Sequence, residues 1–204
     1  MRASWISGAV AASSVLLLVH GYDAFVPDNK TMTCSGDAHL FPFNEQVRGV
    51  NLGGWLVLEP WITPSLFYQF LGNNENDTAM DMYSFCRVMG PAAGNWQLQQ
   101  HWNSWVTEEI IAQLSAHKIN SLRLPVGDWM YKPYAPYTGC TEGALDKVDW
   151  LLDMADKYGM TVLLDLHGIK DSQNGFDNSG MSQDLYWTSV LSTEPVGVVT
   201  FEHW

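Results

Sequence analysis

Residues 161–166 have the sequence Thr-Val-Leu-Leu-Asp-Leu, an almost uninterrupted apolar run. A strand of this composition is typical of a parallel sheet, in which both faces of the strand are buried. Directly before it, residues 141–158 are predicted to form an amphipathic helix that Gly159 ends. The apolar face of this helix consists of Leu145, Val148, Leu151, Leu152 and Ala155. A helix that leads at once into a buried strand indicates a βαβ unit.

Two earlier segments are also predicted to be strands. From Ile119 the apolar period changes to two, with Leu122 and Leu124 on one face. Residues 47–52 form a shorter β-like run, whereas residues 127–129 are expected to be a loop. Gly53 follows the first of these segments along the chain and Gly127 follows the second, so the chain can turn after each strand.

One helix is predicted between these two strands. Thr107 is expected to cap it through its hydroxyl, and the acidic pair Glu108 and Glu109 suits the positive end of the helix dipole. Apolar residues then recur at helical spacing up to about His117, while residues 73–77 belong to a long loop. The order strand, helix, strand, helix, strand predicts a parallel α/β sheet with right-handed crossovers.

This order leaves two architectures open, a doubly wound sheet and a (β/α)8 barrel. The strands begin near residues 47, 120 and 161, so eight such units would need roughly 450 residues. We therefore expect the N-terminal portion of a (β/α)8 TIM barrel, with about three of its eight strands. Such a portion would have an open sheet edge, an uncovered apolar face and low stability by itself.

The composition narrows the range of partners. Acidic residues outnumber basic ones by 22 to 10, for a formal net charge of −12. Nucleic acids and anionic membranes bind clustered Lys and Arg, so both are disfavoured. The sequence contains no P-loop, no nucleophile elbow, no His-Glu-x-x-His and no dinucleotide fingerprint. We expect a neutral ligand, no cofactor and no metal.

Residues 1–24 have the features of a secretory signal peptide. Arg2 supplies the positive start, and residues 6–19 form an apolar run shorter than a membrane-spanning helix needs. We expect cleavage between Val19 and Phe25. A buried N-terminal helix or a membrane anchor is the alternative interpretation.

The rest of the chain is divided accordingly. Residues 25–46 are expected to be an N-terminal arm and residues 47–204 a truncated barrel domain. Asn29 and Asn76 each begin an Asn-x-Thr triplet that accepts N-linked glycans in secreted proteins. We expect the mature protein to be a secreted, monomeric glycoprotein without a membrane partner.

Three cysteines follow the expected cleavage point, at Cys34, Cys86 and Cys140. Secreted chains usually pair their thiols, so either one cysteine is free or its partner lies beyond residue 204. The spacing is too wide for a zinc knuckle, and no Cys-x-x-Cys motif occurs. We interpret these cysteines as structural and leave their pairing open.

Polar residues occur where chemistry is placed in parallel α/β folds, at the carboxyl ends of the strands. They are Asn51, Arg123, Asp165 and His167. Asp165 and His167 are two residues apart and project to the same side of their strand. A structural ion pair between Arg123 and Asp165 is the alternative to a functional site.

Residues 167–180 form a polar, glycine-rich segment around one aromatic ring, which suits a polyhydroxylated ligand. Trp55, Trp61 and Trp129 follow the first two strands and could supply flat faces for sugar rings. Core packing is the more frequent role of tryptophan, because each ring buries a large area.

Several stretches resemble glycoside hydrolase family 5, in particular its secreted exo-β-1,3-glucanases. They are residues 48–61 (RGVNLGGWLVLEPW), 101–105 (HWNSW), 122–129 (LRLPVGDW), 164–168 (LDLHG) and 172–180 (SQNGFDNSG). The resemblance implies a (β/α)8 barrel that hydrolyses β-glucan with retention. One Glu after strand four would be the acid/base and another after strand seven the nucleophile.

The resemblance also assigns roles to residues of this sequence. Glu59 would bind hydroxyls of the terminal glucosyl unit, and Trp55 would belong to the same binding surface. Arg123 would hydrogen-bond the nucleophile, and His167 would orient the catalytic groups. Phe176 would stack on the sugar, with Asp177 and Asn178 nearby. Residues 169–171 (IKD) depart from the small residues and Pro usual in the family, so the loop shape and the linkage preference stay open.

The family's acid/base lies in an Asn-Glu-Pro triplet, which this sequence lacks. Glu194 precedes a proline but comes only 27 residues after His167, too early for a further helix and strand. Both catalytic glutamates are therefore expected beyond residue 204, and the 204 residues alone are expected to be inactive. The alternatives are a non-catalytic glucan-binding protein and a cellulase-like relative.

Overall fold

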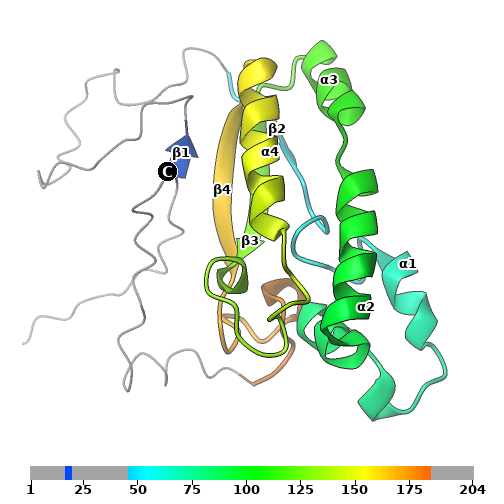
Figure 1. Cartoon of the computed structure of the whole chain (residues 1–204). Coiled ribbons are helices and arrows are strands. Elements are labelled where there is room, and N and C mark those ends of the chain that lie inside the picture. The colour runs from blue at the N-terminus through cyan, green and yellow to red at the C-terminus, as the bar shows by residue number, and fades with distance from the viewer. Residues whose placement is uncertain (1–16, 20–45, 185–204) are drawn as a thin grey trace, which may run out of the picture.

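The computed structural model describes residues 46–184 and the backbone of residues 17–19. Three strands run parallel, β2 (Gly49–Asn51), β3 (Ser121–Gly127) and β4 (Thr161–Gly168). The short strand β1 (Leu17–Val19) pairs antiparallel with β4, which gives the order β1-β4-β3-β2 (Figure 1). The predicted parallel order of the three main strands is confirmed. The expected cleavage point, most of the N-terminal arm, Asn29, Cys34 and Glu194 lie outside the described residues.

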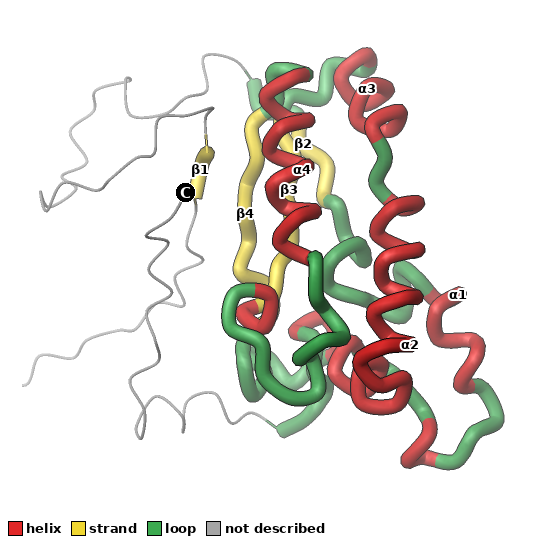
Figure 2. Tube along the Cα trace, viewed as in Figure 1, coloured by secondary structure: helices red, strands yellow, loops and turns green. Residues whose placement is uncertain are grey.

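Helices connect the strands. They are α1 (Pro64–Phe67), α2 (Met82–Trp105), α3 (Glu108–Ala116) and α4 (Ala144–Lys157), with 3-10 turns η1 (Tyr68–Phe70), η2 (Glu75–Asp77), η3 (Asp128–Met130) and η4 (Asp177–Ser179). Figure 1 shows α4 lying across the sheet, with α3 and α2 nearly end to end beside it. The loops that follow β3 and β4 meet the first turns of α2 at one end of the molecule (Figure 2). No described helix is long and apolar enough to cross a bilayer.

The long helix α2 was not predicted. It begins in a capping box, because the Asp81 carboxylate accepts a hydrogen bond from the backbone N–H of Ser84 at 2.7 Å. It breaks at Gly90, whose φ of 71° and ψ of 171° are not helical, and a second helical run starts at Pro91. The break interrupts the apolar repeat, so the sequence pattern shows no single continuous helix.

The sequence predicted the end of α4 correctly and the start of α3 incorrectly. Gly159 has a φ of 64° and ends α4 as expected, since the Met160 N–H donates to the Ala155 carbonyl at 2.8 Å. The prediction for Thr107 was wrong, because its side chain caps no backbone N–H of α3. Its hydroxyl bonds the Glu109 carboxylate instead, which lowers the pKa of that group.

The two faces of the sheet differ in character. Alternate residues of β3 and β4 that pack toward the helices are apolar and buried: Leu122, Leu124, Val126, Val162 and Leu164. The opposite face carries Asn51, Arg123, Leu163, Asp165 and His167, which are half-buried or exposed. Burial of the third strand on both faces, and an apolar open face, were therefore wrong expectations. Among the described residues, the face opposite the helices is mostly polar and half-buried.

An apolar groove of about 330 Å³ runs along the outer edge of β2. Side chains of β2, the loop after it and the α2–α3 junction line it, among them Val50, Leu52, Trp105 and Ile110. Among the described strands, β2 pairs only with β3. The expected open sheet edge is therefore present.

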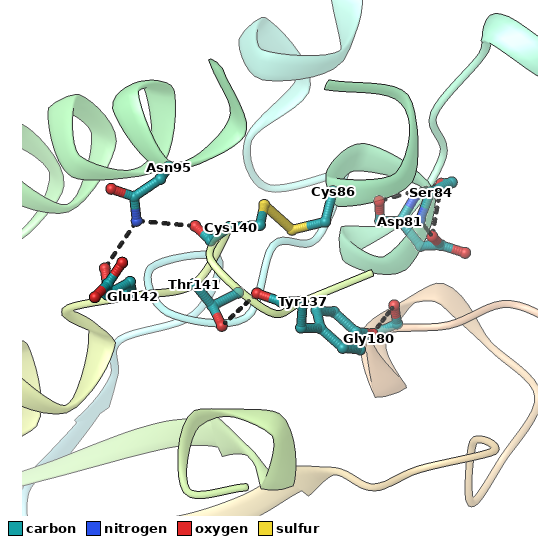
Figure 3. The surroundings of a disulfide bond; sticks show 9 residues. All are labelled: Asp81, Ser84, Cys86, Asn95, Tyr137, Cys140, Thr141, Glu142 and Gly180. Carbon is teal, nitrogen blue, oxygen red and sulfur yellow. Dashed lines mark hydrogen bonds between the residues drawn. A yellow bond between two sulfur atoms is a disulfide. The ribbon is translucent and has the colours of Figure 1, made fainter. Parts of the chain in front are cut away.

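A disulfide joins Cys86 in α2 to Cys140 in the loop before α4, 54 residues later (Figure 3). The Asn95 amide reinforces this junction by donating to the carbonyls of Cys140 and Glu142 at 3.0 and 2.8 Å. Both sulfur atoms are buried. The interpretation of these two cysteines as structural is confirmed, and the pairing that spacing left open is Cys86 with Cys140.

We predict that the double variant Cys86→Ala/Cys140→Ala loses about 2–4 kcal/mol of unfolding free energy, because the cross-link restricts the unfolded chain. Urea denaturation followed by circular dichroism measures this loss. Added reductant should bring the wild-type protein to the stability of the variant and leave the variant unchanged. Coincident unfolding curves for the two proteins without reductant would contradict the prediction.

Candidate active site

The polar cluster on the open face of the sheet is organised around Arg123. Its Nη1 donates to the Asn51 side-chain oxygen at 2.8 Å, across the β2–β3 pair. Its Nη2 donates to Asp165 Oδ2 at 2.5 Å, across the β3–β4 pair. The guanidinium group thus joins side chains of all three parallel strands.

His167 completes the cluster from the end of β4. Its Nδ1 lies 2.8 Å from Asp165 Oδ2 and 3.2 Å from Arg123 Nη2. A carboxylate oxygen only accepts and a guanidinium only donates, so a proton on Nδ1 satisfies the bond to Asp165. The Nε2 atom of the neutral ring is then a hydrogen-bond acceptor. The expected projection of Asp165 and His167 to one side of β4 is confirmed.

The ionised state of Asp165 is favoured by these contacts. Burial alone would raise the pKa of its carboxyl group, but the hydrogen bond from His167 and the charge of Arg123 outweigh burial and lower that pKa. The ion pair that the sequence allowed between Arg123 and Asp165 therefore exists. It is also part of the polar cluster, so the structural and the functional interpretation describe the same contact.

Glu59 is 4% exposed and lies in the loop after β2. Its Oε1 accepts a hydrogen bond from the Gly54 N–H at 3.2 Å. Burial raises the pKa of Glu59, and the charge of Asp177 adds to this, whereas the Gly54 N–H, His167 and Arg123 act in the opposite direction. Glu59 therefore lies within reach of the charges of Arg123 and His167 in the polar cluster and of Asp177 in the loop after β4.

The backbone that carries Glu59 is held by α2. His101 is buried in this helix, and its Nε2 lies 2.7 Å from the Gly54 carbonyl, so a proton on Nε2 makes the bond. The Trp55 indole N–H donates to the Trp102 carbonyl at 3.0 Å. The motif of residues 101–105 thus supports the loop after β2 and does not itself face the open side of the sheet.

The tryptophans divide into core and surface residues. Trp55 and Trp129 are both 0% exposed, so the prediction that Trp55 binds substrate was wrong, and Trp129 likewise presents no face to a ligand. The Trp55 ring packs edge-on against Trp150 at 6.1 Å. Trp61 is 69% exposed and Phe176 is 66% exposed. A large aromatic residue can pack in the core or lie at the surface for a ligand, and only its burial in the structure distinguishes the two roles.

The loop after β4 presents the remaining predicted residues. Asn178 accepts a hydrogen bond from the Asn174 amide at 2.9 Å, and Asp177 begins the turn η4. Asp128 was assigned only to a loop, yet its carboxylate accepts hydrogen bonds from the Lys170 N–H at 2.8 Å and the Tyr134 hydroxyl at 3.0 Å. Its position directly after a strand was the only signal in the sequence for this anchoring contact.

The chain is similar to known proteins in sequence and in fold. The family model named Cellulase (glycosyl hydrolase family 5) matches residues 75–191, more than half of the chain. The chain belongs to glycosyl hydrolase family 5. The predicted family is thereby confirmed, and its members are O-glycosyl hydrolases.

Curated relatives within family 5 carry a more specific name. A glucan 1,3-beta-glucosidase of Blumeria graminis is 45% identical over 152 residues, which are 73% of this chain and 34% of the relative. A sporulation-specific glucan 1,3-beta-glucosidase of Saccharomyces cerevisiae is 46% identical over 149 residues, 70% of this chain and 32% of the relative. The chain thus spans about a third of the length of these relatives.

Among solved structures, a rutinosidase from Aspergillus niger superposes with a TM-score of 0.62 at 23% identity, over 71% of this chain and 39% of that one. The parallel β2-β3-β4 sheet with its helices is accordingly an N-terminal portion of the family 5 (β/α)8 barrel. This decides between the two architectures that the sequence left open. Among the described residues, no group of three or more His, Cys, Asp or Glu side chains is arranged to hold a metal ion.

We predict that Asp165→Asn lowers the unfolding free energy at pH 7 by about 1–3 kcal/mol, because Arg123 loses its charged partner. The folded pKa of Asp165 is below the unfolded value of about 3.9, so its contribution is present above that pH and is lost as the pH falls through the folded pKa. The stability difference between wild type and variant should therefore shrink below about pH 4.

Urea denaturation at several pH values measures this difference. Asp153→Asn is the matched control, because Asp153 is exposed on α4 and makes no contact with the cluster. It should change stability little at any pH. A deficit of Asp165→Asn that is independent of pH would show that the charge of Asp165 is not what holds the cluster.

Proposed function

We propose that the protein is a glucan 1,3-β-glucosidase that acts on β-1,3-glucan with retention of configuration. The observation that carries the proposal is the identity of 45–46% to relatives with that name, over 149 to 152 residues of this chain. The face of the sheet opposite the helices is polar, which agrees with a neutral, hydroxyl-rich substrate. The net charge of −12 also favours a neutral ligand over an anionic one.

Retaining hydrolysis needs two carboxyl groups, one acting as acid/base and one as nucleophile. No Asn-Glu-Pro triplet occurs in the 204 residues, and we place both groups in sequence that follows them. The nucleophile attacks the anomeric carbon while the acid protonates the leaving oxygen, and water then cleaves the glycosyl-enzyme with the acid acting as base. The described residues prepare the site for these steps.

Arg123 is suited to hold the nucleophile. Two of its five N–H donors bind Asn51 and Asp165, which leaves donors for a further carboxylate on the same face. A positive charge at hydrogen-bond distance keeps such a carboxylate ionised and therefore nucleophilic. We assign His167 to orienting the catalytic groups, through the Nε2 atom that Asp165 leaves as an acceptor.

Glu59 and the loop after β4 would bind the sugar. The Glu59 carboxylate is buried, and among the residues that the structure describes its hydrogen-bond donor is the Gly54 N–H, so lone pairs remain for sugar hydroxyls. Phe176 offers an exposed ring that can stack on a pyranose face, with Asp177 and Asn178 beside it. We include these four residues in the binding surface.

A cellulase-like activity on β-1,4-glucan is the second candidate, because the matching family model has that name. Glucose release from laminarin and from carboxymethylcellulose by the complete gene product distinguishes the two. Our proposal requires turnover of laminarin with the β-anomer as first product. Turnover of carboxymethylcellulose alone, or glucan binding without release of sugar, would contradict it.

We also propose that the protein is secreted, monomeric and glycosylated. The Cys86–Cys140 disulfide favours an oxidising compartment, and Arg2 with the following apolar run suits a signal peptide. Asn76 lies exposed in the turn η2, where a glycan has room. Native mass spectrometry of the protein released into the culture medium, before and after deglycosylation, tests all three, because it preserves any oligomer.

We predict that Glu59→Gln raises KM for laminari-oligosaccharides roughly 10- to 100-fold, since charge-assisted hydrogen bonds to sugar hydroxyls are lost. Steady-state kinetics of the complete gene product measures this change. Glu142→Gln is the matched control, because Glu142 is exposed in the loop before α4. Wild-type KM in Glu59→Gln would exclude Glu59 from the binding surface.

A further inference from the structure

The segment of residues 169–182, here called the Phe176 loop, extends an exposed aromatic ring from an otherwise anchored backbone. Phe176 is 66% exposed near its centre. The loop begins in an unusual conformation, because Asp171 and Ser172 have φ values of 66° and 55°. Residues other than glycine adopt such values rarely, so surrounding contacts must hold them.

Two buried serines in this loop bond each other. Ser172 and Ser179 are both 0% exposed, and their Oγ atoms lie 2.6 Å apart. The Gly175 N–H donates to Ser172 Oγ at 2.8 Å, and Ser179 Oγ lies 2.7 Å from the Phe176 carbonyl. Ser179 Oγ also lies 3.1 Å from the Met181 carbonyl. Each hydroxyl has a single proton, so Ser172 donates to Ser179, and Ser179 donates to the nearer Phe176 carbonyl. The hydrogen bonds of Ser172 and Ser179 thus hold the backbone at Gly175 and at Phe176, whose ring is exposed.

The end of the Phe176 loop is fixed to the disulfide-linked part of the molecule. The Gly180 carbonyl accepts hydrogen bonds from the Tyr137 hydroxyl at 3.1 Å and the Tyr83 N–H at 2.8 Å (Figure 3 shows the Tyr137 bond). Gly180 lies so close to Trp129 that an added Cβ would come within 2.2 Å of its ring. Trp129 in turn stacks on Tyr137 at 4.3 Å. These contacts hold Gly180. The backbone around Phe176 is held by the serine pair together with Asn174, whose side-chain oxygen accepts a hydrogen bond from the Phe176 N–H at 2.9 Å.

We propose that Ser172 and Ser179 are positioning residues that hold the Phe176 ring ready to stack on the sugar. The inference rests on the proposed glucan-binding function and adds the means by which the ring is presented. Binding is weakened when a ligand must first order the group it contacts, so a preorganised loop increases affinity. Without the hydroxyl chain, the strained start of the loop would have other conformations available and Phe176 would be ordered only by substrate.

Amide hydrogen exchange tests the anchoring without any glucan. In the complete gene product, Ser172→Ala and Ser179→Ala should each increase exchange at Gly175 and its neighbours about tenfold and leave the sheet unchanged. Ser121→Ala is the matched control, a buried serine at the start of β3, remote from the loop. Unchanged exchange across residues 172–182 in both loop variants would overturn the proposal, whatever the enzyme hydrolyses.

Kinetics with laminari-oligosaccharides tests the link to Phe176. Each serine variant should raise KM about two- to tenfold with little change in kcat, and should raise it no further in a Phe176→Ala background. A merely structural role predicts the same additional loss in both backgrounds, and that result would overturn the proposal. A wild-type protein that neither binds nor cleaves the oligosaccharide contradicts the proposed function instead, and the exchange experiment still reports on the serine pair.

Discussion

The contact between Arg123 and Asp165 is the constraint on which the open face of the sheet depends. A guanidinium group on the middle strand of a sheet is costly unless charged and polar partners surround it. Asp165 supplies the charge from β4 and Asn51 a neutral acceptor from β2. Because the three strands are adjacent and parallel, the same pairing that forms the backbone ladder brings these partners into reach.

Asp165 has two roles. It neutralises the charge of Arg123, and its hydrogen bond determines which nitrogen of His167 carries the proton. The two faces of the sheet nevertheless differ in what holds them together. The helix-facing side of the sheet is apolar and closed, whereas the opposite side is polar and open. Substitutions of Leu122 or Leu164 should therefore act through packing, and substitutions of Arg123 or Asp165 through the charge pairing of the polar cluster.

The sequence predicted the strands and α4 because their apolar periods are regular and their ends carry clear signals such as Gly159. It failed at α2, where the Gly90–Pro91 break interrupts the repeat. It also failed at Trp55, because a large aromatic residue near a strand end suits a core and a sugar platform equally well. The convergence of Asp165 and His167 followed from strand geometry, but the importance of Glu59 and Phe176 came only from the family motif. The hydrogen bonds of Asp128, Ser172 and Ser179 depend on loop conformation, which no periodic pattern encodes.

The position of the disulfide along the chain has a consequence for biosynthesis. Cys86 and Cys140 both precede β4 and the Phe176 loop in the chain. Because synthesis proceeds from the N-terminus, both thiols are present before either of those elements has been made. The cross-link can close in the nascent chain and fix Tyr137 and its neighbours in place. The Phe176 loop, which is synthesised later, can then pack against a support that is already cross-linked.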